Sequence, residues 1–128
     1  MERDTIGLFR NTPNGELLAP GQTVFKEGDP AGIMDVVQSG TLEVSYQGRP
    51  LEQLGEGALF GEMSLISQEP RSCTVTVTAT GEARLVPIDL KRFLFLVEEA
   101  PFFAVTVMKT MSSRLRKMME KLDPAKGL

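Results

Sequence analysis

Turn-forming residues recur about every eight positions between Gly15 and Val86, and this spacing limits that part of the chain to short elements. The expected turns are Pro20-Gly21, Gly28-Asp29-Pro30, Ser39-Gly40, Gln47-Gly48-Arg49-Pro50, Gly55-Glu56-Gly57 and Thr80-Gly81. Between them, apolar and polar residues alternate, as in Leu42, Val44, Tyr46 and in Cys73, Val75, Val77. Alternation with a period of two indicates strands with one face inward. Many short strands with regular turns are typical of a β-sandwich or a small barrel.

After Val86 the apolar period changes to that of helices. Asp89 is a suitable N-cap for a first helix, and Ala100-Pro101 should separate it from a second helix over about 102–122. The predicted fold is therefore mainly β, over about 15–88, followed by two C-terminal helices over about 89–122. The length of 128 residues suits one domain with one core, covering 1–128.

Composition narrows the class of protein. With 41% hydrophobic and 24% charged residues, the chain is expected to fold as a globular domain. No apolar run approaches the roughly 18 residues of a membrane span, and the first residues lack the pattern of a secretory signal. The single cysteine, Cys73, cannot form an internal disulfide, which favours a reducing compartment such as the cytoplasm.

The sequence contains no histidine, which is the commonest metal ligand and the commonest general base near neutral pH. We therefore expect neither catalysis nor a metal site. Residues 1–100 carry eight Lys and Arg against fifteen Asp and Glu, a net charge of −7, whereas residues 101–128 carry six against two, a net charge of +4. A basic segment can bind nucleic acid or an acidic membrane, but charges spread over several turns favour a solvated helix face.

The stretch from Leu59 to Val75 carries the clearest chemistry. Gly61 allows a tight turn and a close approach of the backbone to a ligand. A single helical turn then follows, and its first amides and positive dipole end favour an anion. Nine residues after Glu62, Arg71 offers a planar fork of donors, and Ser72 adds a hydroxyl. These features predict a site for a phosphate group.

Glu62 has to be explained separately, because a carboxylate beside a phosphate is repelled by it. It fits such a site if it accepts hydrogen bonds from sugar hydroxyls and also pairs with Arg71. A ligand with one phosphate charge and a nearby free hydroxyl would meet these conditions. The alternative interpretation is a tight turn with a surface Glu–Arg pair and no ligand.

The runs Phe60-Gly61-Glu62-Met63-Ser64-Leu65-Ile66 and Arg71-Ser72-Cys73-Thr74-Val75 resemble the phosphate-binding cassette of cyclic-nucleotide-binding domains. That family includes catabolite activator protein, regulatory subunits of cyclic-AMP-dependent kinase and cyclic-nucleotide-gated channels. The turn at 25–30 and the hairpin at 36–42 are also similar to the family, and the resemblance implies a β jelly roll. Asp35 stands where relatives often carry an aromatic residue, and we interpret it as an exposed position without a function.

The resemblance implies a sensor for cyclic AMP, or for cyclic GMP as the second choice. It assigns Glu62 to the ribose 2′-hydroxyl, Arg71 with Ser72 to the cyclic phosphate, and backbone amides of Gly61 and Met63 to the same phosphate. Cys73 is in phase with the inward residues of its strand, so it either contacts the ligand or fills the core. The last helix often acts as a lid in this family, and Arg114 and Met118 are the lid candidates.

The last helix also carries an apolar heptad seam. Its members are Ala104, Met108, Met111, Leu115, Met118 and Leu122. Either this seam packs on the barrel or it forms a homodimer and helps to relay ligand binding to an unknown effector protein. We expect no helix-turn-helix after Leu122, and so no sequence-specific binding of nucleic acid. The alternative function is a jelly-roll module that binds no ligand and serves interaction or dimerisation.

Overall fold

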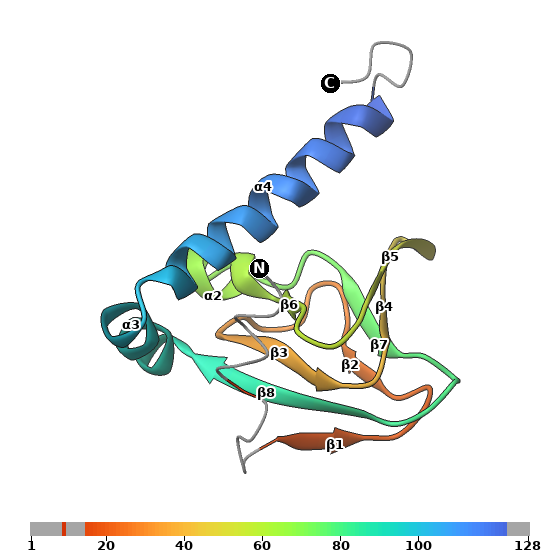
Figure 1. Ribbon diagram of the computed structural model, residues 1–128. Helices are drawn as coiled ribbons and strands as arrows, with labels where there is room; N and C mark the ends of the chain where they lie inside the picture. Colours follow the sequence, from red (N-terminus) through yellow and green to blue (C-terminus); the bar gives the residue numbers. More distant parts are fainter. Residues whose placement is uncertain (1–8, 10–14, 123–128) are drawn as a thin grey trace.

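The computed structural model describes residue 9 and residues 15–122, and its strands form two antiparallel sheets that face each other (Figure 1). The first sheet has the order β1 (Glu16–Leu18), β8 (Ala83–Asp89), β3 (Ile33–Ser39), β6 (Leu59–Phe60). The second has the order β2 (Thr23–Phe25), β7 (Thr74–Val77), β4 (Leu42–Tyr46), β5 (Arg49–Leu54). The predicted jelly roll is confirmed. The expectations for the turn at 11–14 and for the end of the chain after residue 122 lie outside the described residues.

Strand β3 has buried residues on both of its faces. Met34 and Val36 belong to a core between the first sheet and the helices, whereas Val37 belongs to a core between the two sheets. Both edges of β3 are paired, with β6 on one side and β8 on the other. The strand is therefore the common wall of the two cores, and the alternation of its side chains decides which core each residue enters.

Asp35 is buried, with 7% of its surface exposed, so the interpretation of this position as exposed is wrong. Its side chain is in phase with Val37 and so faces the space between the sheets. The pairing partners of Asp35 are Phe60 on β6 and Pro87 on β8. Sequence alternation alone did not reveal its burial, because a strand that is covered on both faces has no solvent side.

Three helices complete the described part: α2 (Glu62–Ser67), α3 (Leu90–Glu99) and α4 (Phe102–Leu122). The Asp89 side chain accepts a hydrogen bond of 2.8 Å from the backbone amide of Arg92, which confirms the predicted N-cap of α3. The predicted break between the two C-terminal helices is also confirmed, since α3 ends at Glu99 and α4 begins after Pro101.

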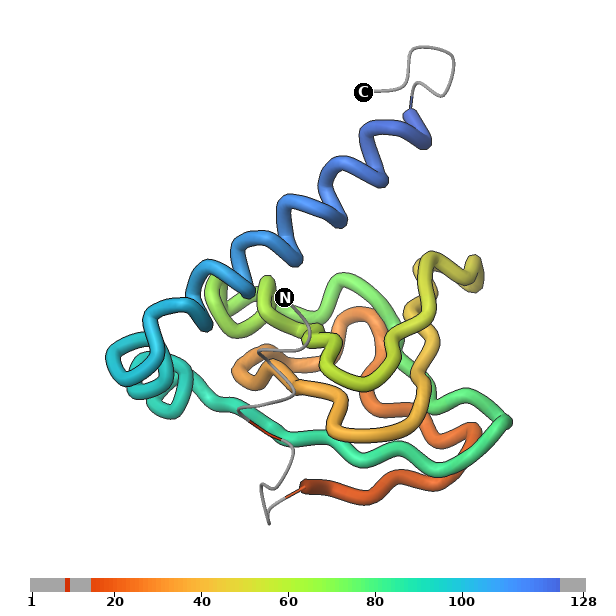
Figure 2. The backbone as a smooth tube through the Cα atoms, in the orientation of Figure 1, coloured from red at the N-terminus to blue at the C-terminus, as the bar shows by residue number. Residues whose placement is uncertain are grey.

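Only the first half of α4 contributes buried side chains to the core. Its buried residues are Phe103, Thr106 and Val107. The second half extends beyond the strands (Figures 1 and 2). Of the heptad seam, Met111 packs against the core, while four members are largely exposed: Met108, Leu115, Met118 and Leu122. The interpretation that this seam packs on the barrel is therefore wrong for most of its length.

The turn between β3 and β4 depends on Gly40, and a pair of glycine substitutions tests this. Gly40 has a φ of 90°, and a Cβ there would collide with the Glu82 carbonyl oxygen and lie 2.6 Å from the Ala83 Cα. Gly48 has a φ of 79°, and a Cβ there would meet no atom of the described residues within 4 Å. We expect Gly48→Ala to lower the free energy of unfolding by about 1–2 kcal/mol and Gly40→Ala to lower it by more than about 3 kcal/mol, because it adds a backbone collision. Urea unfolding measures both, and equal losses would contradict this account of the hairpin.

Candidate functional site

Gly61 joins β6 to α2 and brings three parts of the chain together. Its φ of 82° lies in the left-handed region, which a residue with a Cβ adopts only with strain. A Cβ at this position would lie 2.6 Å from Nη1 of Arg71 and 3.2 Å from the Ile33 carbonyl oxygen. The N-cap of α2 makes no side-chain hydrogen bond, and the first amides of a helix have no partner within it. The residue thus permits both the turn and the approach of Arg71.

The Arg71 guanidinium is turned into the protein, and the residue is only 9% exposed. Its Cζ lies 4.0 Å from the centre of the Phe25 ring, which is a cation–π contact. In the described part of the chain, Nε and Nη1 are buried and have no hydrogen-bond partner. Buried donors in native proteins are nearly always paired, so these two atoms call for an acceptor. An anion placed beside Gly61 would supply it.

The backbone of Arg71 is anchored to the turn that precedes β3. The Arg71 amide donates to the Asp29 carbonyl oxygen at 2.9 Å, and the Gly28 amide donates to the Arg71 carbonyl oxygen at 2.8 Å. The Asp29 carboxylate in turn accepts from the Lys26 amide at 2.9 Å. The turn over 25–30 therefore fixes Arg71 in two ways: it bonds to the Arg71 backbone, and its Phe25 ring stacks on the Arg71 guanidinium.

Glu62 pairs with Arg114, so the expected pair between Glu62 and Arg71 is wrong. Glu62 is 3% exposed, and its Oε1 accepts from Nη1 of Arg114 at 2.6 Å. The same guanidinium donates from Nε to Glu52 at 2.9 Å and from Nη2 to the Leu59 carbonyl oxygen at 2.7 Å. Arg71 cannot serve as this partner because its guanidinium stacks on Phe25, whereas α4 brings Arg114 directly to α2.

The other predicted site residues lie around this centre with different exposure. Met63 is 55% exposed, so only its backbone amide could contact a buried ligand. Ser72 is also exposed, and its hydroxyl is the group that could reach such a ligand. Cys73 is half-buried, and burial raises the pKa of its thiol. Of the two lid candidates, Arg114 reaches the site, while Met118 is 63% exposed. The Ser64 hydroxyl, which was not predicted, is buried without a partner among the described residues.

Three residues that sequence reasoning did not assign to the site prove to shape it: Phe25, Asp35 and Glu52. Burial raises the pKa of the Asp35 carboxyl to about 7, and the nearby Arg71 opposes that rise. Phe25 lies in the turn motif already recognised, so its position was a usable signal. The partnership of Glu52 with Arg114 spans 62 positions and has no signature in local sequence.

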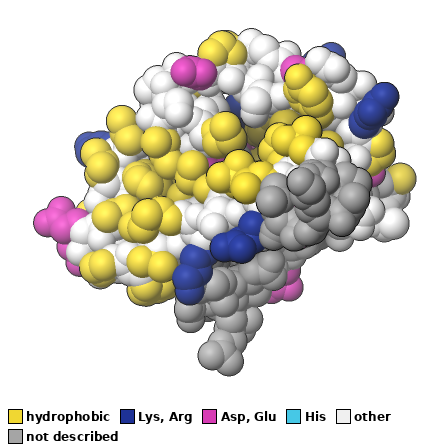
Figure 3. All heavy atoms as spheres, turned by 90° about the horizontal axis from the view of Figure 1, so that it is seen from above, with side chains coloured by type: hydrophobic (Ala, Val, Ile, Leu, Met, Phe, Trp, Pro, Cys, Tyr) yellow, Lys and Arg dark blue, Asp and Glu magenta, His cyan; other side chains and the backbone are white. Residues whose placement is uncertain are grey.

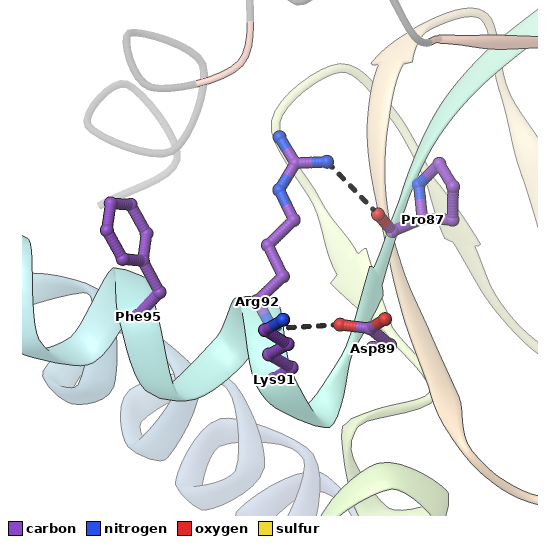
Figure 4. Close-up of a pocket in the computed structure, with 5 residues that line it drawn as sticks. All are labelled: Pro87, Asp89, Lys91, Arg92 and Phe95. Carbon is purple, nitrogen blue, oxygen red and sulfur yellow. Dashed lines mark hydrogen bonds between the residues drawn. The ribbon is translucent and has the colours of Figure 1, made fainter.

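Two cavities lie near the helices. A groove of about 420 Å³ runs between residues 52–59 and α4, and its lining includes Arg114 but neither Glu62 nor Arg71. A second hollow, of about 430 Å³, lies at the start of α3, where Arg92 Nη1 donates to the Pro87 carbonyl oxygen at 3.4 Å (Figure 4). In this hollow the Arg92 guanidinium bonds to the backbone of β8 and the Asp89 carboxylate bonds to the backbone of α3, so both groups serve the junction between the strand and the helix.

The described residues contain no group of three side chains suited to hold a metal ion. Within the same part of the chain, no helix has the length and apolar character needed to cross a membrane.

Comparison with known proteins identifies the fold family. The family model of the cyclic nucleotide-binding domain matches residues 16–100. The chain is 30% identical over 112 residues to the cyclic AMP receptor protein of Thermus thermophilus, covering 84% of this chain and 51% of that protein. It is 43% identical over 61 residues to a cGMP-dependent protein kinase of Toxoplasma gondii, covering 48% of this chain and 6% of the kinase.

Among solved structures, the crystal structure of Thermus thermophilus catabolite activator protein superposes with a TM-score of 0.74 at 27% identity, covering 98% of this chain and 59% of that one. The chain therefore spans about half of one curated relative and a small part of the other. The match of the family model to most of the barrel and to α3, together with the shared fold, shows that this chain belongs to the cyclic nucleotide-binding domain family.

Proposed function

We propose that the chain is a regulatory module, one domain over 1–128, that binds a cyclic nucleotide at Arg71, with cyclic AMP the first choice and cyclic GMP the second. The observation that carries the proposal is the buried Arg71 guanidinium with two unused donors, one of which, Nη1, lies beside Gly61. The name of the Thermus thermophilus relative, a cyclic AMP receptor protein, supports cyclic AMP, and that of the Toxoplasma gondii kinase supports cyclic GMP.

Each group at the site has a role in this proposal. The guanidinium of Arg71 donates to the exocyclic oxygens of the cyclic phosphate, with Nη1 as the donor beside Gly61, and the amides at the start of α2 and the hydroxyl of Ser72 add donors. Oε1 of Glu62 is held by Arg114, so that the other oxygen, Oε2, accepts from the ribose 2′-hydroxyl. Pairing with Arg114 also compensates the charge of Glu62, which reduces its repulsion of the phosphate. Cys73 lines the site as a neutral thiol.

We propose binding without catalysis for this module. The sequence has no histidine to act as a general base or metal ligand. The groups that surround the phosphate position are hydrogen-bond donors, which bind an anion but do not activate a nucleophile.

Replacing Arg71 tests the binding proposal. We expect Arg71→Leu to lose about 2–5 kcal/mol of binding free energy for cyclic AMP, because a charge-assisted fork is removed from a site shielded from water. This corresponds to a dissociation constant higher by roughly 30-fold to several thousand-fold. Isothermal titration calorimetry measures it, with the exposed Arg49→Leu as the matched control. Unchanged affinity in Arg71→Leu would overturn the assignment.

We further propose that Arg114 relays occupancy to α4. It is the residue that joins the carboxylate of α2 to the last helix, and its ion pairs lie at the point where α4 leaves the barrel. A ligand hydroxyl at Glu62 changes the strength of this pair and so shifts the population of α4 positions.

Hydrogen exchange tests the relay. We expect saturating cyclic AMP to change the exchange protection of residues 89–122 in the wild-type protein, and to change it less in Arg114→Met, which keeps Arg71 but loses the link to Glu62. Arg116→Met is the matched control, since it makes the same substitution at an exposed position of the same helix and should leave the ligand response unchanged. Identical protection of this segment with and without ligand would contradict the relay.

A second candidate function is self-association through α4, and a specific observation favours it. Leu115, Met118 and Leu122 lie on the heptad seam and are 60%, 63% and 84% exposed. Hydrophobic side chains also gather over the face of the molecule seen in Figure 3. Exposed apolar side chains that repeat along one seam of a helix favour a helix–helix interface, and a second copy of the seam is its natural complement.

Sedimentation equilibrium tests self-association. We expect Leu115→Glu to weaken the dimer at least about tenfold, because it places a charge in the apolar seam. Ser112→Glu is the matched control, since it adds the same charge at an exposed position outside the seam. A wild-type protein that is monomeric at all concentrations would rule out this function. A dimer that shows no binding of any cyclic nucleotide in calorimetric titrations would favour the ligand-free module.

A further inference from the structure

Asp35 is a buried carboxyl group that the proposed function does not use. It lies on β3 in phase with Val37, so its side chain faces the space between the two sheets. Its cross-strand partner on β6 is Phe60, the residue that precedes Gly61. A carboxyl in such a place is costly when ionised, because water is excluded from it. The barrel therefore holds a titratable group directly behind the turn that starts α2.

A chain of contacts places Arg71 at the same end of the barrel. The rings of Phe60 and Phe25 lie 5.9 Å apart between centroids, and the Arg71 guanidinium lies over Phe25. Nη1 of Arg71 also approaches Gly61, next to Phe60. Among the described residues no ion pair joins Asp35 to Arg71, yet each shifts the pKa of the other. The Asp35 carboxyl and the unused donors of Arg71 thus lie at the same end of the barrel, within electrostatic reach of each other.

The charged groups around Asp35 are few. Arg71 favours its ionised form, and the exposed Glu16 on β1 disfavours it. Asp29, in the turn before β3, acts on Arg71. On α2, Glu62 is already paired with Arg114. The paired residues on β6 and β8, Phe60 and Pro87, carry no charge.

We propose that Asp35 is a positioning residue for Arg71: its neutral form leaves the guanidinium free for the ligand phosphate, and its ionised form attracts the guanidinium and repels the phosphate. This rests on the proposed binding of a cyclic nucleotide at Arg71. Ligand binding is then coupled to uptake of a proton by the Asp35 carboxyl. One proton is taken up from solvent for each ligand bound at Arg71. No covalent bond of the ligand changes, and no other reactant takes part.

The sign follows from linkage. A cyclic phosphodiester keeps a single negative charge across the neutral range, so the ligand itself does not titrate. Burial already brings the pKa of Asp35 to about 7, and a phosphate nearby raises this pKa further. Affinity is therefore highest below pH 7 and falls as the pH rises through 7. If the ionised form binds poorly, the dissociation constant rises up to about tenfold between pH 6 and pH 8.

Calorimetric titration with cyclic AMP between pH 6 and pH 8 tests the inference. We expect the wild-type dissociation constant to rise about fivefold to tenfold across this range, and that of Asp35→Asn to stay flat and to match the wild-type value at pH 6. Glu98→Gln is the matched control, because it removes an exposed carboxylate on α3 and should keep the pH dependence. At pH 7, titrations in two buffers of different ionisation enthalpy should show proton uptake in the wild type and none in Asp35→Asn.

A pH profile in Asp35→Asn equal to that of the wild type would overturn this inference and leave the binding proposal standing. Absence of cyclic AMP binding at every pH in the wild type would instead overturn the binding proposal. A measurement on the wild-type protein tests the inference even if Asp35→Asn does not fold. The NMR titration of the Asp35 carboxyl carbon should give a higher pKa with cyclic AMP than without it, and an unchanged pKa would equally overturn the inference.

Discussion

The burial of the Arg71 guanidinium against Phe25 is the interaction around which the site is arranged. A cation that leaves water loses much of its solvation, and the aromatic face replaces only part of it. Two of its donors remain unused within the described residues. The fold contributes the rest by anchoring the backbone of Arg71 to the turn before β3 and by placing a glycine where a side chain would collide with it. A preorganised cation of this kind binds an anion without having to reorganise first.

Glu62 shows how a carboxylate can be tolerated close to such a site. Arg114 reaches it from α4, 52 positions later in the chain, and also holds Glu52 and the Leu59 carbonyl oxygen. One guanidinium therefore ties together β5, β6, α2 and α4. Because three acceptors share this single donor group, a change at any of them alters the others. At Arg114 the barrel and α4 are joined by ion pairs, whereas nearer the start of α4 they are joined by apolar packing.

Much of the architecture was predictable from local pattern. The turns around Gly21, Gly40 and Gly48, the cap at Asp89 and the break at Ala100-Pro101 each follow from residue types with strong backbone preferences. The closeness of Gly61, Glu62 and Arg71 was also predictable, because a recognisable motif holds all three. The partner of Glu62 was not, since Arg114 is distant in sequence and charge alone does not choose between two arginines. The burial of Asp35 was missed for a related reason: a doubly covered strand shows no alternation that would mark a solvent face.

The position of β3 between two cores has a consequence for how the chain chooses its strand pairing. A slip of one residue would carry the carboxyl of Asp35 into the apolar layer beneath the helices and would move Met34 into the barrel. The buried side chains of that layer are apolar and offer an ionised carboxyl no hydrogen bond. The acidic side chain thus penalises the wrong alignment of β3 against β8 more than any apolar residue could, and it acts as a register lock for the central strand of the fold.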